Sequence, residues 1–128
     1  MKHIVFFLCF LCLTAISAMA QDAVKVDPKH YTVEFENAQV RVLRIKYSPH
    51  EKSVMHSHPA GAVIMLTDNK NRFTFLDGKT EETQGKAGQV LQAEAVTHLP
   101  ENLSDQPFEA ILVELKAKPA KSRQRKKP

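Results

Sequence analysis

The chain has 128 residues, 43% of them hydrophobic, with seven Phe, two Tyr and no Trp, and its formal net charge is +4. This length suits one domain with a single core and excludes an array of several domains. The charge is uneven, because residues 116–128 hold seven basic residues and no acid, whereas residues 21–115 hold ten basic and fourteen acidic residues, a net charge of −4. The composition therefore predicts a mildly acidic domain over 21–115 and a basic, disordered tail over 116–128.

Residues 1–20 are predicted to be a signal peptide. A short basic start precedes an apolar run over residues 4–16, and Ala18-Met19-Ala20 fits the small-x-small cleavage signal, so Gln21 is the expected first residue of a periplasmic or secreted chain. An uncleaved membrane anchor is the alternative, although the run is shorter than the roughly 20 apolar residues that cross a bilayer. Both cysteines lie in this segment, so the exported chain would have neither a disulfide nor a catalytic thiol.

From Tyr31 onward, short runs rich in β-branched and aromatic residues alternate with turn signals, and no amphipathic helix is predicted. The expected strands are 31–35, 40–47, 53–58, 62–67, 72–76, 79–84, 89–92, 96–98 and 108–115. Segment 68–71 and the Asp77-Gly78 pair are predicted hairpin turns, and 100–106 is a predicted loop. The continuous apolar run 62–67 predicts a buried strand. The pattern indicates an all-β sandwich or barrel.

Two histidines of the predicted strand 53–58 share one face, because side chains alternate along a strand with a period of two. His56 and His58 would point either to water, where they need no explanation, or into the barrel, where unpartnered imidazoles are costly to bury. A metal removes that cost, and His98 from a second strand would complete one face of its coordination sphere. His30, near the expected mature N-terminus, and His50, in a loop, are predicted to be ordinary surface residues.

The histidines and their spacing resemble the two motifs of the cupin superfamily. The first motif, G-x5-H-x-H-x(3,4)-E-x6-G, is matched at its centre by His56-x-His58-Pro59, and the second, G-x5-P-x-G-x2-H-x3-N, is matched at its end by His98-x3-Asn102. The resemblance covers residues 33–115. It implies a single-domain jelly-roll β-barrel in which the two motifs face each other, and in which His56, His58 and His98 bind a divalent transition metal.

Several positions depart from the family pattern. In the first motif, Ala62 and Val63 stand where the glutamate is usual, and His50 stands at the opening glycine. In the second motif, Ala93 and Ala95 stand where the proline and the second glycine are usual. Gly88 lies one residue closer to His98 than the opening glycine of that motif. The implied ligand set is thus three histidines without a carboxylate, which suits zinc with a bound water, or iron or manganese with open positions. The loss of a carboxylate is expected to make the metal a stronger Lewis acid and to weaken its binding.

Glu94 and Glu101 are the carboxylates nearest to the second motif, so they are weak candidates for proton transfer or for replacing the missing ligand. Glu94 precedes His98 by four residues and would share its face on a regular strand, whereas a bend between them would separate the two. Asn102 is predicted to cap the loop after His98 by bonding backbone groups.

Other side chains are candidates for the barrel lumen. Met65, Phe73 and Phe75 would either line a cavity or belong to a plain core. Arg44 and Tyr47 would be placed to orient an anionic ligand, although an arginine on a strand is more often solvated or paired with an acid.

Three functions stay open from the sequence. The first is a small exported metal-dependent enzyme, a dioxygenase or isomerase acting on a small anionic or oxygenated organic molecule. The second is a metal- or ligand-binding module without catalysis, and the third is a metal-free structural cupin. A small molecule is the expected partner. Nucleic acid is not expected for an exported chain, nor is stable membrane insertion after signal cleavage, and the apolar run 111–113 allows a homodimer through the outer sheets.

Overall fold

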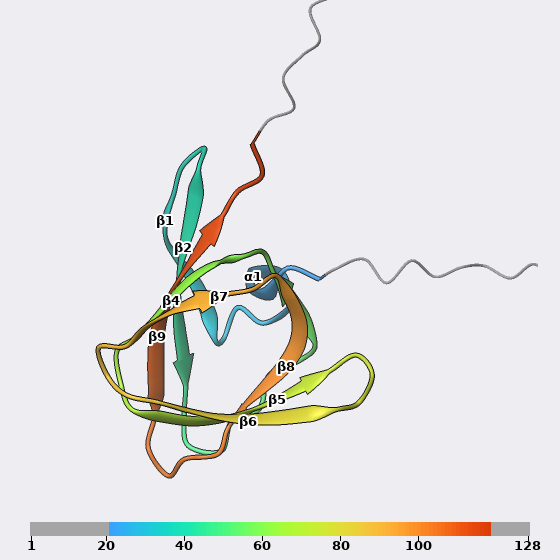
Figure 1. Ribbon diagram of the computed structural model, residues 1–128, viewed down its shortest axis with the longest axis vertical. Coiled ribbons are helices and arrows are strands. Elements are labelled where there is room, and N and C mark those ends of the chain that lie inside the picture. The colour runs from blue at the N-terminus through green and yellow to red at the C-terminus, as the bar shows by residue number, and fades with distance from the viewer. Residues whose placement is uncertain (1–20, 119–128) are drawn as a thin grey trace, which may run out of the picture.

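A computed structural model describes residues 21–118, so the expected signal peptide and residues 119–128 of the expected tail lie outside the described residues. The described chain folds into nine strands and one short helix (Figure 1). These are α1 (Ala23–Val26), β1 (Tyr31–Glu36), β2 (Val40–Tyr47), β3 (His56–His58), β4 (Gly61–Met65), β5 (Asn69–Phe75), β6 (Thr80–Gly85), β7 (Val90–Ala93), β8 (Val96–Asn102) and β9 (Phe108–Leu115). No helix within 21–118 is long and apolar enough to cross a membrane.

The strands form two antiparallel sheets around a common interior. The five-stranded sheet has the order β1-β2-β9-β4-β7, and the four-stranded sheet has the order β3-β8-β5-β6. The chain passes from one sheet to the other between β2 and β3, β3 and β4, β4 and β5, β6 and β7, β7 and β8, and β8 and β9. Figure 1 looks along the resulting barrel. The predicted all-β jelly-roll barrel is therefore confirmed.

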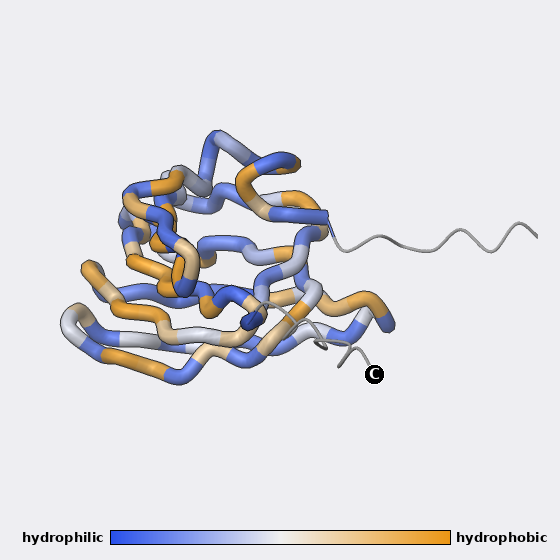
Figure 2. Tube along the Cα trace, turned by 90° about the horizontal axis from the view of Figure 1, so that it is seen from above, coloured by the Kyte–Doolittle hydropathy of each residue, from blue (hydrophilic) through white to orange (hydrophobic). Residues whose placement is uncertain are grey.

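The alternation of side chains along β2 and β9 builds most of the core. The two strands pair over their full length, from Val40 opposite Leu115 to Tyr47 opposite Phe108. Every second residue faces the interior and is buried, namely Leu43, Ile45 and Tyr47 in β2 and Phe108, Ala110 and Leu112 in β9. Figure 2 shows the matching alternation of hydrophobic and hydrophilic residues along the chain. Both strands have the bounds that the sequence predicts, because each repeats its apolar residues with period two.

The outward face of the five-stranded sheet is also apolar. Half-buried side chains of β2, β4 and β9 lie on it, namely Val42, Ala62, Ile64, Ile111 and Val113. The expectation that 62–67 is a buried strand is wrong, because β4 is half-buried throughout and only its inward side chains Val63 and Met65 pack against the core. A homodimer through the outward face stays a prediction.

The structure confirms one predicted hairpin turn and corrects the other. Gly78 turns β5 into β6 with a φ of 81°, which glycine adopts without strain. Segment 68–71 is not a hairpin turn, because β5 begins at Asn69 and lies in a different sheet from β4. Asn69 and Asn71 are buried opposite Gly85 and Thr83 of β6. Their polarity therefore marks the barrel interior and not a turn.

The predicted loop 100–106 begins later than expected, because β8 continues through Pro100. The Pro100 carbonyl accepts the Ser53 amide at 2.9 Å, on the side of β8 where β3 has already ended. The nitrogen of Pro100 points to the same side as its carbonyl. Because β3 does not extend there, the lack of an N–H removes no hydrogen bond between strands. Asn102 caps the following loop as predicted, since its amide donates to the Gln106 carbonyl at 2.9 Å and accepts from the Ser104 amide at 3.0 Å.

The β1–β2 hairpin projects beyond the barrel beside the end of β9 (Figure 1). Lys116, the first residue of the expected tail, is held there. Its amide donates to the Gln39 carbonyl at 2.8 Å, and its ammonium group pairs with Glu36 at 2.5 Å. The division into a signal peptide, a domain and a tail at 1–20, 21–115 and 116–128 stays a prediction.

Candidate metal centre

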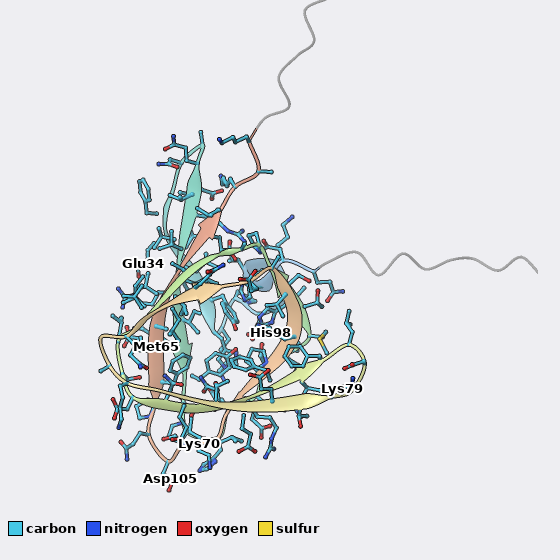
Figure 3. All side chains as sticks on the ribbon, in the orientation of Figure 1. Glu34, Met65, Lys70, Lys79, His98 and Asp105 are labelled. Carbon is cyan, nitrogen blue, oxygen red and sulfur yellow. The ribbon has the colours of Figure 1, made fainter. Side chains whose placement is uncertain are left out.

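Three histidines from two neighbouring strands meet inside the barrel. β3 supplies His56 and His58, and β8 supplies His98, which lies directly opposite His56 in the antiparallel register. One ring nitrogen from each histidine lies within 4.8 Å of the corresponding nitrogens of the other two. Figure 3 shows His98 pointing into the interior. The structure thus brings together the three histidines that the sequence singles out.

The hydrogen bonds of β3 leave the same nitrogen free on both of its histidines. His56 is fully buried, and its Nδ1 donates to the Val54 carbonyl at 2.8 Å. His58 Nδ1 donates to the Glu114 carboxylate at 2.8 Å. Each ring therefore keeps a lone pair on Nε2, and the buried Nε2 of His56 has no hydrogen-bond partner among the described residues. A buried, unpartnered acceptor beside two further imidazoles fits a metal ligand, because metal coordination would satisfy it.

The surroundings keep two of the imidazoles neutral. Burial and the neighbouring His58 lower the pKa of His56 to about 4. Burial, followed by His56 and His58, lowers the pKa of His98 to about 3. Since only the neutral imidazole can donate a lone pair to a metal, these two rings are ready to bind one at neutral pH without losing a proton.

A buried carboxylate that no motif of the sequence predicts stands behind His58. Glu114 is 1% exposed, and it accepts a hydrogen bond from Arg41 Nε at 2.6 Å as well as the one from His58. Arg41 in turn donates to Asp22 at 2.5 Å, and Asp22 caps α1. Burial would raise the pKa of Glu114, but the hydrogen bonds from His58 and Arg41 outweigh it and hold the pKa below its usual value. Glu114 is therefore an anion that orients His58.

The alternation of side chains along β9 is the feature of the sequence from which Glu114 could have been predicted. The residue continues the inward series of Phe108, Ala110 and Leu112, so an acid stands on the face of the strand that the core occupies. Parity alone does not say which face is inward. Arg41 gives the second part of the signal, because it lies opposite Glu114 in the β2–β9 register.

Glu114→Gln is expected to weaken metal binding about 10- to 100-fold, because a neutral amide is a poorer acceptor for the Nδ1–H of His58 and leaves Arg41 short of one counter-charge. Competition with a chromophoric chelator measures the affinity. Glu109→Gln is the matched control, since Glu109 lies on the outward parity of the same strand and pairs with Arg44. An affinity for Glu114→Gln within twofold of the unchanged protein would show that Glu114 does not support the site.

Glu94 and Glu101 lie outside the three-histidine group. The chain leaves strand geometry between β7 and β8, so Glu94 does not share the strand of His98, and it accepts a hydrogen bond from Gln92 at 2.6 Å. Glu101 follows His98 with the opposite parity and faces Arg72 at 3.6 Å. Both residues border the interior cavity, and their role in proton transfer stays a prediction.

The expectation that His30 is a surface residue is wrong. His30 is 5% exposed, and its ring stacks on Tyr47 with centroids 4.2 Å apart. Its Nδ1 faces Asp27 at 2.7 Å and its Nε2 faces Glu51 at 3.0 Å, while Asp27 also accepts the hydroxyl of Ser53. His30 is buried because two carboxylates occupy both of its ring nitrogens, so it has no free nitrogen for a metal.

His50 is a surface residue, as predicted. Its side chain is 61% exposed and bonds Asp105 at 2.6 Å. Its φ of 59° lies in the left-handed region that favours glycine. The departure from the opening glycine of the first motif therefore falls at a position where the backbone favours glycine.

A cavity of about 380 Å³ opens beside the histidines. His58 and His98 border it together with Met65, Phe73 and Phe75, so the candidate lumen residues are confirmed. Tyr47 borders it as well, and its hydroxyl is 2.8 Å from that of Tyr31. The residues that border the cavity are Tyr31, Ile45, Tyr47, His58, Val63, Met65, Asn69, Asn71, Phe73, Phe75, Glu81, Thr83, Gln84, Leu91, Gln92, Ala93, Glu94, Val96, His98, Pro100, Glu101, Asn102, Phe108 and Leu112.

Arg44 does not reach the cavity. It lies on the outward face of β2, where it pairs with Glu34 and Glu109. The expectation that Arg44 orients an anionic ligand in the lumen is therefore wrong, and two surface carboxylates are its partners instead.

Comparison with known proteins finds similarity in structure. No family model matches the sequence, and no curated protein matches it either. A cupin domain from Bordetella pertussis Tohama I is 26% identical, with a TM-score of 0.63 over 68% of this chain and 92% of that one. An RmlC-like cupin family protein with a double-stranded β-helix fold from Methanocaldococcus jannaschii is 18% identical, with a TM-score of 0.52 over 70% of this chain and 83% of that one. A cupin superfamily protein from Desulfitobacterium hafniense DCB-2 is 11% identical, with a TM-score of 0.51 over 68% and 76% of the two chains.

Proposed function

We propose that this chain, which belongs to the cupin superfamily, binds one divalent transition metal through His56, His58 and His98 together. The buried Nε2 of His56 supports this proposal most directly, because no other group among the described residues satisfies it. The bond from His58 to Glu114 adds the carboxylate–histidine contact that commonly orients a metal ligand. Iron, zinc and manganese all suit three imidazole donors.

The first function that we propose for this site is that of a metal-dependent dioxygenase or isomerase acting on a small organic molecule. A bound metal would supply Lewis-acid activation of an oxygen atom and, in the case of iron, redox chemistry with dioxygen. His58 and His98 border the cavity, so a molecule held there would reach the ligand set. Three protein donors leave coordination positions for it.

The second candidate is a metal- or ligand-binding module without catalysis. It is favoured by the absence of a carboxylate from the three-histidine group of residues 21–118. Glu94 and Glu101, the candidates for proton transfer, pair with Gln92 and Arg72 instead of with the histidines.

Metal analysis of the purified, untagged protein tests the proposed site. We expect about one equivalent of iron, zinc or manganese after reloading, because the three donors form one site. Less than about a tenth of an equivalent of any transition metal after reloading would contradict both metal-binding functions. If iron is bound, oxygen consumption with a panel of small thiols, diketones and phenols would separate the enzyme from the module.

We also propose that the protein is exported. The apolar run over residues 4–16 and the Ala18-Met19-Ala20 site support export. Mass spectrometry of the protein from its own cells is expected to find a chain that begins at or near Gln21, and a chain that retains Met1 would contradict this proposal.

A further inference from the structure

The cavity beside the three histidines is lined by aromatic rings. Tyr31, Tyr47, Phe73, Phe75 and Phe108 all border it. The ring of Phe73 stacks on that of His98, with centroids 4.9 Å apart and an angle of 9° between the ring planes. A flat apolar ring is therefore the occupant that these walls would pack against best, and about 380 Å³ accommodates a substituted six-membered ring.

The cavity has no cationic group for an anion. Among the described residues that border it, none is a lysine or an arginine. The three arginines of the described barrel each pair with carboxylates elsewhere: Arg41 with Asp22 and Glu114, Arg44 with Glu34 and Glu109, and Arg72 with Glu82 and Glu101. A carboxylate or phosphate group entering away from the metal would lose its hydration without gaining a counter-charge.

Negative charge stands at the exposed border of the cavity instead. Glu81 faces inward on β6, opposite Phe73, and Glu94 lies in the connection between β7 and β8. Both are exposed and both border the cavity. β6 lies two strands from β8, and Glu81 is level with Pro100, two residues beyond His98, so the backbone at Glu81 is about 12 Å from the backbone at His98. A short side arm on a ring held at His98 would therefore reach towards Glu81.

We propose that the cavity binds an aromatic compound with a hydroxyl oxygen donor and an uncharged or cationic side arm, and that it discriminates against compounds of the same shape whose side arm is anionic. The oxygen donor is directed to His58 and His98, and this end of the ligand rests on the proposed metal site. The discrimination by charge rests on the cavity residues alone. An anionic substrate, which the sequence leaves open, is disfavoured because the lining offers such a molecule only carboxylates and neutral groups.

Three catechols that share one head group and differ in the charge of the side arm test this inference. They are dopamine, which is cationic, 2-(3,4-dihydroxyphenyl)ethanol, which is neutral, and 3,4-dihydroxyphenylacetate, which is anionic. Binding is measured by ligand-detected NMR and calorimetry without oxygen, on the zinc-loaded and on the zinc-free protein. We expect the anion to bind at least about tenfold more weakly than the alcohol, and dopamine to bind at least as tightly as the alcohol.

A double variant, Glu81→Gln with Glu94→Gln, leaves Glu101, which pairs with Arg72, as the remaining bordering carboxylate. It is expected to reduce the advantage of dopamine over the alcohol and to leave the affinity of the alcohol within about twofold. Glu82→Gln is the matched control, because Glu82 has the opposite parity on β6 and pairs with Arg72 outside the cavity. It should keep the original order of affinities.

The outcomes separate this inference from the proposed metal site. A protein that does not load with zinc but still prefers the alcohol over the anion would contradict the metal site alone. An anion that binds the zinc-free protein as tightly as the alcohol would overturn the charge discrimination, whether or not zinc loads. Failure of all three compounds to bind either form at millimolar concentration would also overturn it.

Discussion

His98→Ala is expected to abolish metal binding, with a loss in affinity of more than about a hundredfold. The variant leaves two donors on β3 and removes the only one that comes from β8. Loss of a direct ligand should exceed the 10- to 100-fold effect of losing a group that merely orients one. His98 is also the best of the three positions to test, because it is only half-buried and the fold should tolerate its truncation.

The measurement is the metal content after reloading and dialysis, together with competition against a chromophoric chelator. His50→Ala is the control, since His50 is an exposed histidine that bonds Asp105 and lies outside the three-histidine group. Circular dichroism must show that both variants keep the β-rich spectrum. Retention of a full equivalent of metal by folded His98→Ala would overturn the ligand assignment.

Gly61→Ala is expected to lower the free energy of unfolding by at least about 3 kcal/mol or to prevent folding. A Cβ at Gly61 would overlap the backbone carbonyl oxygen of Val113 and would come within 2.9 Å of its carbonyl carbon. These are backbone atoms of β9, the strand next to β4, so no side-chain rotation can relieve the clash. Gly61 also lies opposite Glu114, so a shift of β9 here would disturb the carboxylate that orients His58.

Urea denaturation followed by circular dichroism measures this effect. Gly78→Ala is the matched control, because Gly78 has open space around it and only its φ of 81° opposes a side chain. That backbone strain should cost about 1 kcal/mol. If Gly61→Ala unfolds within 1 kcal/mol of the unchanged protein, the two strands are less closely packed at this point than the structure indicates.

Much of the barrel follows from local patterns in the sequence. The bounds of β2 and β9 were predictable because β-branched and apolar residues repeat along them with period two, and the hairpin at Gly78 follows from its Asp-Gly pair. The predicted turn at 68–71 and the predicted loop from Pro100 are wrong for the same reason. Asn69 and Pro100 have the composition of turns and loops, but each sits in a strand whose neighbours accommodate it.

The burial of His56 and of His30 could not be predicted from residues close to them in the sequence. The spacing of His56 and His58 places them on one face but leaves that face free to be inside or outside. His30 lies in no such pattern. One of its carboxylate partners, Asp27, is three positions away, but the other, Glu51, is twenty-one positions away. The charges that decide whether a histidine is free or occupied therefore come partly from distant parts of the chain.

The sequence by itself determined the fold class, most of the strands and the three histidines, because strand periodicity and turn chemistry act between residues that are close along the chain. Only the tertiary structure decided that these histidines face inward and that Glu114 and Arg41 stand behind them, because the pairing of β2 with β9 and of β3 with β8 joins segments that are far apart along the chain. It also decided the charge of the cavity. Which carboxylates and arginines meet there depends on strand register, and register is fixed by packing of the whole barrel.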